Sequence, residues 1–312
     1  MSKLKTFLNT DELKKKSVCS PYSNKNKINN NTCFTPKTLV KLRDIYNSNS
    51  TNKIHSNNPS TIWNMLHKYK PGQCQKDECW IQTIVNDDAT KKKLEALLFP
   101  PKYPKEWTTK PNTWLSNYDI LDVLKQYEET YPHFLFIGPS SIDYDVVLSD
   151  NKCVCNNLCH FSLQQVRKKH SKIGIIFNLD PHTSSGSHWV SLFIDLQDRF
   201  IFYFDSTGEK IPMEIKKFVQ KVVVQNKKLG LPKLHFYQND KMEHQLGNTE
   251  CGMYSLYFII SMLMREKSDG TKMSKNDVIQ LFLGKHGRIN DKTIETLRKV
   301  FYSSGGTRKK RK

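Results

Sequence analysis

The hydrophobic positions of this chain follow two periods, which separate predicted strands from predicted helices. Continuous runs rich in Ile, Val, Phe and Tyr predict strands at 172–179, 189–196, 199–206 and 233–239. Apolar residues at helical spacing predict helices at 118–131, 214–228, 251–263, 274–283 and 289–302. A short turn joins the second and third of these strands, which predicts an antiparallel hairpin. Because strands and helices are mixed and one strand pair is antiparallel, the expected fold class is α+β.

The first third of the chain has a different pattern. Helices are predicted at 35–46, capped by Thr35; at 60–69, capped by Ser60; and at 87–98, which begins with aspartates. The Asn-rich stretches 22–31 and 46–60 are predicted to be loops.

The stretch 99–113 contains four prolines and is predicted to be a linker. The expected organisation is therefore a partly helical, basic and Asn/Lys-rich N-terminal extension at 1–105, a main domain at 106–304, and a flexible basic tail at 305–312.

Composition limits the classes of protein that fit. Hydrophobic residues make up 37% of the 312 positions, enough for a substantial core, and the formal net charge is +19. Such a charge attracts nucleic acid or another polyanion, although a Lys- and Asn-rich coding bias would also produce it. We find no apolar run of the roughly 18–20 residues that cross a bilayer, and the N-terminus lacks the apolar core of a signal peptide. We therefore expect an intracellular protein whose eight cysteines are mostly reduced thiols, without a disulfide framework.

Candidate chemistry begins with Cys251, at the first position of a predicted helix. The free N–H groups and positive dipole end there favour a thiolate. The hairpin pairing is expected to place His188, at the start of one strand, beside Asp205, at the end of the next. Gln245 precedes Cys251 by six positions and can donate to a developing oxyanion. Each residue alone also fits a structural role: a core cysteine, a strand-end histidine, a turn aspartate or a surface glutamine.

Taken together, these residues resemble the ubiquitin-like-protein (SUMO-specific) cysteine protease family, in the order His188-Trp189, Asp205, Gln245, Cys251-Gly252. The stretches "TECGMYSLYFI" and "SGSHWVSLFID" are particularly similar to its viral branch, which includes the African swine fever virus and adenovirus proteases. The resemblance covers about 110–265. It implies the adenain/SUMO-protease fold, with a central, mostly antiparallel sheet flanked by helices, and acyl transfer without a required cofactor or metal. In that reaction Cys251 is the nucleophile, His188 the acid and base, Asp205 its orienting group, and Gln245 with the Cys251 backbone N–H the oxyanion hole.

The stretch "WLSNYDI" at 114–120 resembles the "WLND" motif that opens the catalytic domain in cellular members of this family. The resemblance implies that Trp114 and Trp189 form a narrow tunnel over a substrate Gly-Gly, with Asn117 and Gly252 nearby as substrate-binding positions. Trp114 could instead be a core residue. Asn117 stands where the family has Asp, so the resemblance does not carry a charge contact to this position.

Two further motifs remain outside this set. The cysteines of "CQKDEC" (74–79) and "CVCNNLCH" (153–160) raise a zinc hypothesis, but the spacing is not that of the usual zinc pairs, so zinc is not expected. The C-terminus contains Gly305-Gly306-Thr307, a candidate self-cleavage site, followed by a basic segment that suits nucleic-acid binding or nuclear import.

The expected function is that of a cysteine endopeptidase of a large DNA virus, which cleaves structural precursors after Gly-Gly during virion maturation. Its partners would be capsid or core precursors, its place the virion and the host cytoplasm, and DNA, through the basic surface, an activator. One alternative is a protease that deconjugates SUMO, ubiquitin or a related modifier. A second is a nucleic-acid-binding protein with an inactive protease fold. No membrane partner is expected.

Overall fold

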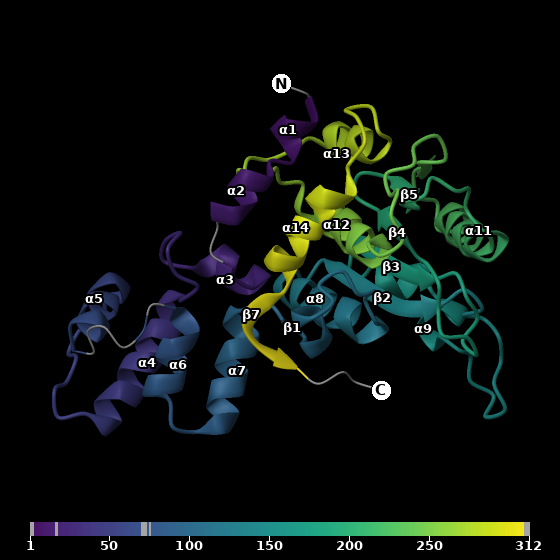
Figure 1. The fold of residues 1–312 in the computed structure, drawn as a ribbon. Helices are drawn as coiled ribbons and strands as arrows, with labels where there is room; N and C mark the ends of the chain where they lie inside the picture. Colours follow the sequence, from purple (N-terminus) through teal and green to yellow (C-terminus); the bar gives the residue numbers. More distant parts are fainter. Residues whose placement is uncertain (1–2, 16–17, 70–73, 75, 309–312) are drawn as a thin grey trace. The chain divides into compact units, whose positions relative to one another are not determined.

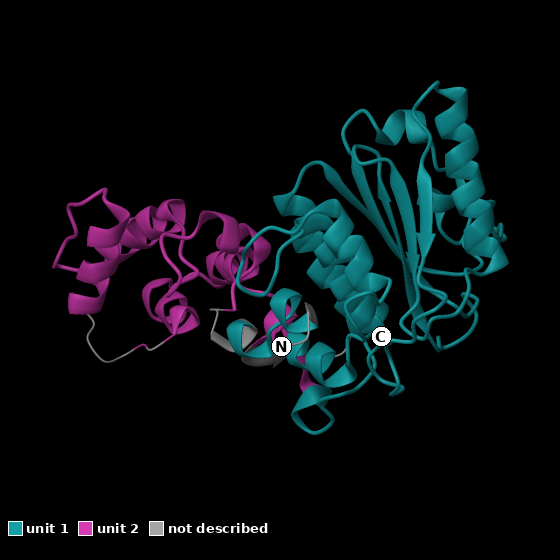
Figure 2. Cartoon of the chain, turned by 90° about the horizontal axis from the view of Figure 1, so that it is seen from above, with its two compact units in different colours: residues 1–13, 106–298, 311–312 teal, residues 14–105, 299–310 magenta. Residues whose placement is uncertain are grey.

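The computed structural model describes residues 3–15, 18–69, 74 and 76–308 (Figure 1). These divide into two compact units (Figure 2). Unit 1 contains 3–13 and 106–298, and unit 2 contains the rest. One boundary lies between Lys105 and Glu106, within the proline-rich stretch. The sequence-based division did not assign 3–13 to the larger unit or 299–308 to the smaller one, because both assignments depend on contacts between segments far apart in the chain.

Unit 1 is built on a five-stranded sheet in the order β2-β3-β4-β5-β6. The strands are β2 (Phe134–Ser141), β3 (Lys172–Asn178), β4 (Trp189–Asp195), β5 (Phe200–Phe204) and β6 (His235–Gln238). The inner pairs β3–β4 and β4–β5 are antiparallel, whereas the outer pairs β2–β3 and β5–β6 are parallel. The sheet is therefore mixed, with the predicted hairpin at its centre. Both parallel pairs need a crossover, which for β5–β6 contains helix α11 (Met213–Lys228).

Helices cover both faces of this sheet (Figure 2). On one face, Phe218 and Val222 of α11 join a core cluster with Ile175 of β3 and Leu192 of β4. On the other face lie α8 (Asn117–Thr130) and α12 (Cys251–Met264); Phe258 of α12 stacks on Phe204 of β5. Because both faces of the sheet are buried, the central strands consist of continuous runs of apolar residues instead of alternating apolar and polar residues.

The remaining helices are short or lie outside these layers. They are α1 (Lys3–Phe7), α2 (Thr10–Lys15), the 3₁₀ turn η1 (Lys105–Thr108), α9 (Asn156–Cys159), α10 (Leu163–Val166), α13 (Lys275–Phe282) and α14 (Asp291–Phe301). No helix among the described residues is long and apolar enough to cross a membrane.

Unit 2 is mainly helical. Its helices are α3 (Pro21–Asn26), α4 (Pro36–Asn49), α5 (Pro59–Tyr69), α6 (Asp77–Ile84) and α7 (Asp88–Leu98). Helices α4 to α7 pack around one apolar cluster. The predicted cap of α4 is confirmed, since the Thr35 hydroxyl accepts a hydrogen bond from the Thr38 amide. The predicted Ser60 cap of α5 is wrong: Ser60 lies inside the helix, and Asn58 accepts from the Thr61 amide instead. The predicted loop at 22–31 is partly helical, because Ser20 caps α3 and Pro21 occupies its first position.

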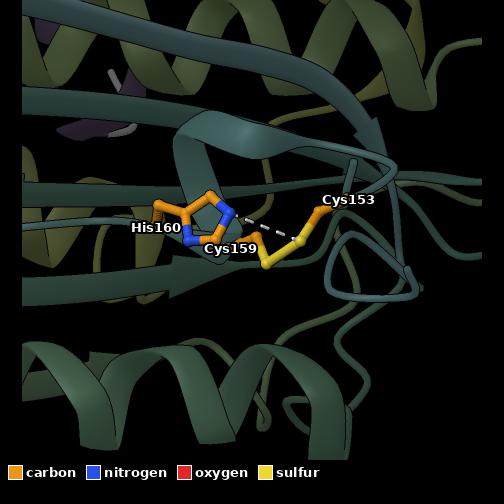
Figure 3. A group of neighbouring side chains, drawn as sticks. All are labelled: Cys153, Cys159 and His160. Atoms are coloured by element: carbon orange, nitrogen blue, oxygen red, sulfur yellow. Dashed lines mark hydrogen bonds between the residues drawn. A yellow bond between two sulfur atoms is a disulfide. The ribbon is translucent and has the colours of Figure 1, made fainter. Parts of the chain in front are cut away.

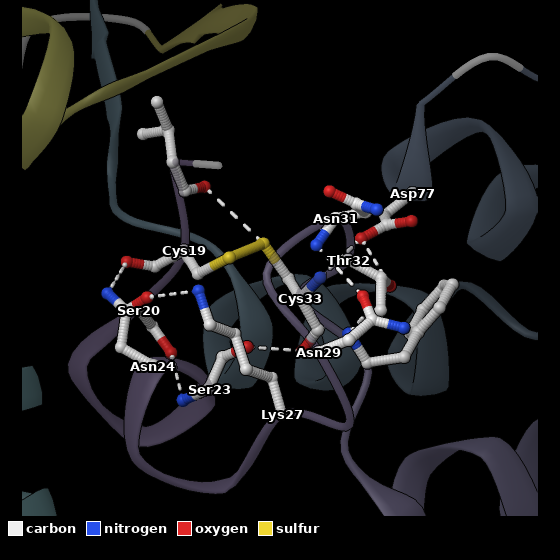
Figure 4. The surroundings of a disulfide bond; sticks show 12 residues. Cys19, Ser20, Ser23, Asn24, Lys27, Asn29, Asn31, Thr32, Cys33 and Asp77 are labelled. Carbon is white, nitrogen blue, oxygen red and sulfur yellow. Dashed lines mark hydrogen bonds between the residues drawn. A yellow bond between two sulfur atoms is a disulfide. The ribbon is translucent and has the colours of Figure 1, made fainter. Parts of the chain in front are cut away.

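The expectation of free thiols is contradicted at three places. Disulfides join Cys19 to Cys33, Cys74 to Cys79 and Cys153 to Cys159, leaving Cys155 and Cys251 free. Figure 4 illustrates the first pair, where the Thr32 hydroxyl and the Cys33 amide both donate to Asp77 and so fix the loop that carries Cys33. The prediction rested on cellular compartment, which carries no information about which cysteines the fold brings together.

The C-terminal segment also differs from the predicted flexible tail. Ser303–Arg308 forms strand β7, which pairs in parallel with β1 (Lys102–Pro104) inside unit 2. Residues 309–312 of the predicted tail lie outside the described residues. A glycine-rich segment is flexible only while its backbone groups are unpaired, and β1 supplies partners that the local sequence does not reveal.

Candidate active site

His188 and Asp205 meet at one end of the central hairpin. His188 directly precedes β4 and Asp205 directly follows β5, and Ser191 of β4 pairs with Phe204 of β5. The Nε2–H group of His188 donates a hydrogen bond of 2.7 Å to Oδ1 of Asp205. The structure therefore brings these two predicted residues into direct contact, as antiparallel pairing requires.

Asp205 is fully buried, and its carboxylate is held by more than His188. Oδ1 also accepts from the amide of Thr207 at 2.9 Å and from its hydroxyl at 2.8 Å. The side chain of Asn239 accepts from the Asp205 amide at 3.0 Å and donates to the Asp205 carbonyl at 2.6 Å. Sequence reasoning missed both partners. Thr207 carried a local signal, an aspartate bonding two residues onward, whereas Asn239 is 34 residues away and carried none.

Cys251 is the first residue of α12, and its side chain is buried within hydrogen-bonding reach of His188. Since Asp205 already engages Nε2, Nδ1 is the ring nitrogen left for the sulfur. One turn into the helix, the Ser255 hydroxyl donates to the Trp189 carbonyl at 3.2 Å, and the Ser191 hydroxyl donates to the Ser255 carbonyl at 3.4 Å. These two bonds fasten the start of α12 to the start of β4 and so hold the sulfur beside the imidazole.

Opposing effects act on the imidazole of His188. Burial lowers its pKa, whereas hydrogen bonds with Asp205 and Cys251, together with their negative charges, raise it. The net result is a pKa raised from 6.5 to about 10. The protonated ring is therefore favoured at neutral pH, and it places a cation beside the sulfur of Cys251.

Gln245 lies in the segment that leads to Cys251, and its side chain is buried. Its Oε1 accepts from the Ser206 hydroxyl at 2.8 Å, and its Nε2 donates to the Gly247 carbonyl at 2.8 Å. A primary amide has two N–H donors, so one of them is used by Gly247. Ser206 directly follows Asp205, which means that the glutamine and the histidine–aspartate pair are held by the same short segment.

The loop after Gln245 is braced by Asp291, the first residue of α14. Its Oδ2 accepts from the amides of Leu246 at 3.1 Å and Gly247 at 3.2 Å, and its Oδ1 accepts from the Tyr254 hydroxyl at 2.9 Å. Tyr254 lies one turn after Cys251 on α12. Asp291 thus couples the glutamine loop to the cysteine helix, a role that nothing in the local sequence indicated.

A buried ion pair fixes the residue immediately before Cys251. Arg298 of α14 donates from Nε to Oε2 of Glu250 at 3.0 Å and from Nη2 to Oε1 at 2.9 Å, and their side chains are only 5% and 2% exposed. Arg298 also donates to the Thr113 carbonyl at 2.9 Å and lies over the ring of Trp107. Because Glu250 is engaged with Arg298, it does not cap α12 with its side chain. The pair was not predicted, since the two residues are 48 positions apart.

The two predicted tryptophans lie close to this cluster. Trp114 is 46% exposed, and its indole N–H donates to the Asn248 carbonyl at 2.6 Å, in the loop between Gln245 and Cys251. Trp189 follows His188, and its indole N–H donates to the Leu115 carbonyl at 3.0 Å. Both indoles are therefore fixed beside the cysteine segment, and the exposure of Trp114 speaks against a core role.

Gly252 and Asn117, the other two predicted substrate-binding positions, lie in different surroundings. Gly252 is buried against Leu115, and a Cβ added there would lie 2.9 Å from the Leu115 Cβ. Asn117 is the exposed first residue of α8. The nearby carboxylate belongs to Asp119, which accepts from both the amide and the hydroxyl of Ser116 at 2.7 Å and so caps α8.

A thiol, an imidazole and a carboxylate in contact, with the thiol at a helix N-terminus, are the arrangement of a cysteine protease. A family model described as the Ulp1 protease family, C-terminal catalytic domain, matches residues 156–294. A thiol protease of Acanthamoeba polyphaga mimivirus is 31% identical over 261 residues, covering 77% of this chain and 83% of the relative. The chain belongs to the Ulp1 protease family, and it is a cysteine protease.

A second relative and a solved structure agree with this assignment. The SUMO-1 cysteine protease of African swine fever virus is 27% identical over 162 residues, 48% of this chain and 58% of that protein. The crystal structure of the African swine fever virus protease superimposes with a TM-score of 0.61 at 20% identity, over 97% of this chain and 99% of that one. The likeness extends through both units, so the helical N-terminal region belongs to the shared fold.

Proposed function

We propose that Cys251, His188 and Asp205 are the catalytic triad, with Gln245 and the backbone N–H of Cys251 as the oxyanion hole. The observation that carries this proposal is the contact of His188 with both Asp205 and Cys251. One imidazole nitrogen must be held by a carboxylate, which orients the ring, while the other faces the sulfur and exchanges protons there. The α12 N-terminus, uncapped by Glu250, leaves backbone N–H groups of its first turn free for a developing negative charge.

In the reaction, the Cys251 sulfur attacks the carbonyl carbon of the scissile peptide bond. The oxyanion is held by the Cys251 amide and by the second N–H of Gln245, and one such donor is worth about 2.7–4 kcal/mol in the transition state. His188 gives its Nδ1 proton to the leaving amine as the C–N bond breaks. It then accepts a proton from water, which attacks the thioester and releases the carboxylic acid and the free sulfur. The chemistry uses neither a metal ion nor an organic cofactor.

The substrate is a protein cleaved after Gly-Gly. Trp114 and Trp189 are both fixed by indole N–H bonds to backbone carbonyls that flank the cysteine. Aromatic faces held this way accept a substrate backbone that lacks Cβ atoms and exclude bulkier residues. The biological role is the maturation cleavage of capsid or core precursors, in the virion and in the cytoplasm of the infected cell. Viral origin of the relatives named above supports it. The net charge of +19 supports nucleic acid as a further partner and DNA as an activator.

A second function, deconjugation of a ubiquitin-like modifier, is favoured by the similarity to the African swine fever virus relative, which is named a SUMO-1 cysteine protease. A panel of substrates separates the two. Short peptides containing Gly-Gly-X should be cut efficiently by a maturation protease, whereas a deconjugating enzyme should need the folded modifier. Efficient cleavage of SUMO or ubiquitin fusions without cleavage of peptides would overturn the maturation role.

The triad is tested with the full chain and an electrophilic Gly-Gly probe. Wild type should be labelled, whereas Cys251→Ala and His188→Ala should not. Cys155→Ala, which removes the other free cysteine, is the control and should be labelled like wild type. Labelling that survives in Cys251→Ala, or a wild type that is never labelled, would refute the assignment. A wild type that is never labelled would favour the alternative hypothesis of a nucleic-acid-binding protein with an inactive protease fold.

A further inference from the structure

We propose that a second site, formed by Cys153, Cys159 and His160, binds a zinc ion when the disulfide between the two cysteines is reduced (Figure 3). The two sulfur atoms and one imidazole nitrogen all lie within 4.8 Å of one another. These side chains take no part in the proteolytic chemistry described above. The sequence spacing by itself did not favour a metal, and the inference rests on the position of the three side chains in the fold.

The separation of the ligand atoms suits a tetrahedral ion. Nε2 of His160 lies 3.9 Å from the sulfur of Cys153. Zinc–sulfur and zinc–nitrogen bonds of about 2.3 and 2.0 Å place tetrahedral neighbours about 3.5–3.8 Å apart. The imidazole nitrogen lies within a few tenths of an ångström of this spacing from one sulfur. After reduction the two sulfur atoms must move apart, and the imidazole must shift slightly toward the ion. Thiolate and imidazole ligands together favour Zn²⁺ over the harder cations Mg²⁺ and Ca²⁺.

Backbone hydrogen bonds hold the three residues together independently of the disulfide. Cys153 lies on a short antiparallel ribbon, where it pairs with Val147, and its amide donates to Oδ1 of Asn156 at 3.0 Å. The amide of His160 donates to the Asn156 carbonyl at 2.9 Å, which closes the turn of α9. Reduction therefore leaves Cys153 and His160 anchored to the same asparagine, while the amide of Cys159 stays bonded to the Cys155 carbonyl at 2.9 Å.

The other end of the site is fastened to the sheet layer. Lys221 of α11 donates to the Cys159 carbonyl at 2.6 Å, and Leu158 between the ligands belongs to the buried core. His160 is exposed while Cys153 is buried, so the cluster has one open side through which an ion can enter. That side also leaves the fourth tetrahedral position to water. Cys155 is packed against the core and is not a member of the cluster.

Zinc binding at this site requires reduction of the Cys153–Cys159 disulfide. A dithiol reductant supplies two electrons and two protons, the S–S bond breaks, and the reductant becomes a cyclic disulfide. Binding of Zn²⁺ then displaces the two thiol protons to solvent. A disulfide oxidant, such as the cyclic disulfide of the same dithiol, reverses the sequence: it takes up two electrons from the thiolates and two protons from solvent, its own S–S bond breaks, and the Cys153–Cys159 bond re-forms. The ion then leaves, because a disulfide sulfur is no longer an anionic ligand.

The test uses the full chain carrying Cys251→Ser, so that the active-site thiol cannot take up metal. The protein is reduced with a phosphine, exposed to zinc sulfate, freed of unbound ion and analysed for bound zinc. We expect about one zinc ion per chain, as for a single site with three protein ligands and one water. In the same background, Cys153→Ser, Cys159→Ser and His160→Ala should lose most of this zinc, and Cys155→Ser should keep it.

Two further readouts keep the proposal open to refutation. Cobalt(II) bound to the reduced protein should give the intense sulfur-to-metal absorption bands and tetrahedral visible bands, and both should vanish in Cys159→Ser. Unchanged circular dichroism spectra would show that the metal-free variants are folded. Equal zinc content in the oxidised and reduced proteins, or undiminished binding by the Cys159→Ser and His160→Ala variants, would overturn the proposal, and so would no retained zinc in the reduced parent.

Discussion

Arg298→Met should destabilise unit 1 and should do so more strongly at neutral pH than at acidic pH. The substitution keeps much of the side-chain volume but removes both hydrogen bonds to Glu250 and the bond to the Thr113 carbonyl. Removing one partner of a buried pair leaves the other as an uncompensated charge, which costs about 3–5 kcal/mol. With side chains only 5% and 2% exposed, little of this cost can be recovered by solvent.

The pH dependence follows from Glu250. Burial raises its pKa above 4.5, and this outweighs the hydrogen bonds and charge of Arg298, which lower it. When the pKa of a carboxyl group is higher in the folded protein than in the unfolded chain, its contribution to stability is fully present below the unfolded-state pKa. This contribution is lost as pH rises through the folded-state pKa. Without Arg298 the pKa rises further, so the variant takes up a proton on folding. The difference in unfolding free energy between wild type and variant should therefore shrink by up to about 1.4 kcal/mol per pH unit as pH falls from 7.5 toward 5.

Urea unfolding at several pH values, followed by circular dichroism and by hydrogen exchange of the α12 amides, measures this difference. Glu250→Gln combined with Arg298→Met should recover part of the loss, because no charge is then buried. Lys292→Met, an exposed change on the same helix, should alter the unfolding free energy by less than about 0.5 kcal/mol. An Arg298→Met penalty that is independent of pH, or no larger than that of Lys292→Met, would refute the reasoning about an unpaired carboxylate.

Three other predictions concern the loop, the helix and the C-terminal strand. Asp291→Ala frees the loop after Gln245, so kcat measured by steady-state kinetics should fall about tenfold to a hundredfold with little change in KM. Adding Asp291→Ala to Gln245→Ala should cause almost no further loss of kcat, because both changes act through the same glutamine. Gly252→Ala should destabilise the protein by about 1–3 kcal/mol in urea unfolding, since its Cβ would lie 2.9 Å from the nearest side chain. Cleavage after Gly306 should not occur in the native protein, because β7 is paired with β1; intact masses of wild type and Cys251→Ala should then both correspond to the whole chain.

Each of these has an outcome that would count against it. Additive losses in the Asp291 and Gln245 double variant would mean that Asp291 acts on folding and not through the glutamine. Gly247→Ala is the control for Gly252, since its Cβ would meet nothing closer than 3.9 Å, and equal destabilisation of the two variants would rule out crowding as the cause. A wild-type mass lacking the last six residues, with Cys251→Ala intact, would establish self-processing.

The local part of this protein could be predicted from its sequence. The hairpin that carries His188 and Asp205 was predicted because its two strands are adjacent in the chain, and pairing across a short turn leaves one arrangement of their ends. The start of α12 at Cys251 was predicted from apolar periodicity. The cap of α4 at Thr35 followed from the residue types at its first positions.

Tertiary structure decided what the periodicity of the chain could not. Cys251 reaches His188 only because α12 packs on β4, and the two bonds of Ser255 that fasten them join residues 66 and 64 positions apart. The Glu250–Arg298 pair and the bracing by Asp291 likewise depend on chain positions that no short-range pattern relates. Local propensity and periodicity describe a residue's neighbours within a few positions, whereas a buried charge or thiol finds its partner through the packing of whole elements, and that packing is a property of the complete fold.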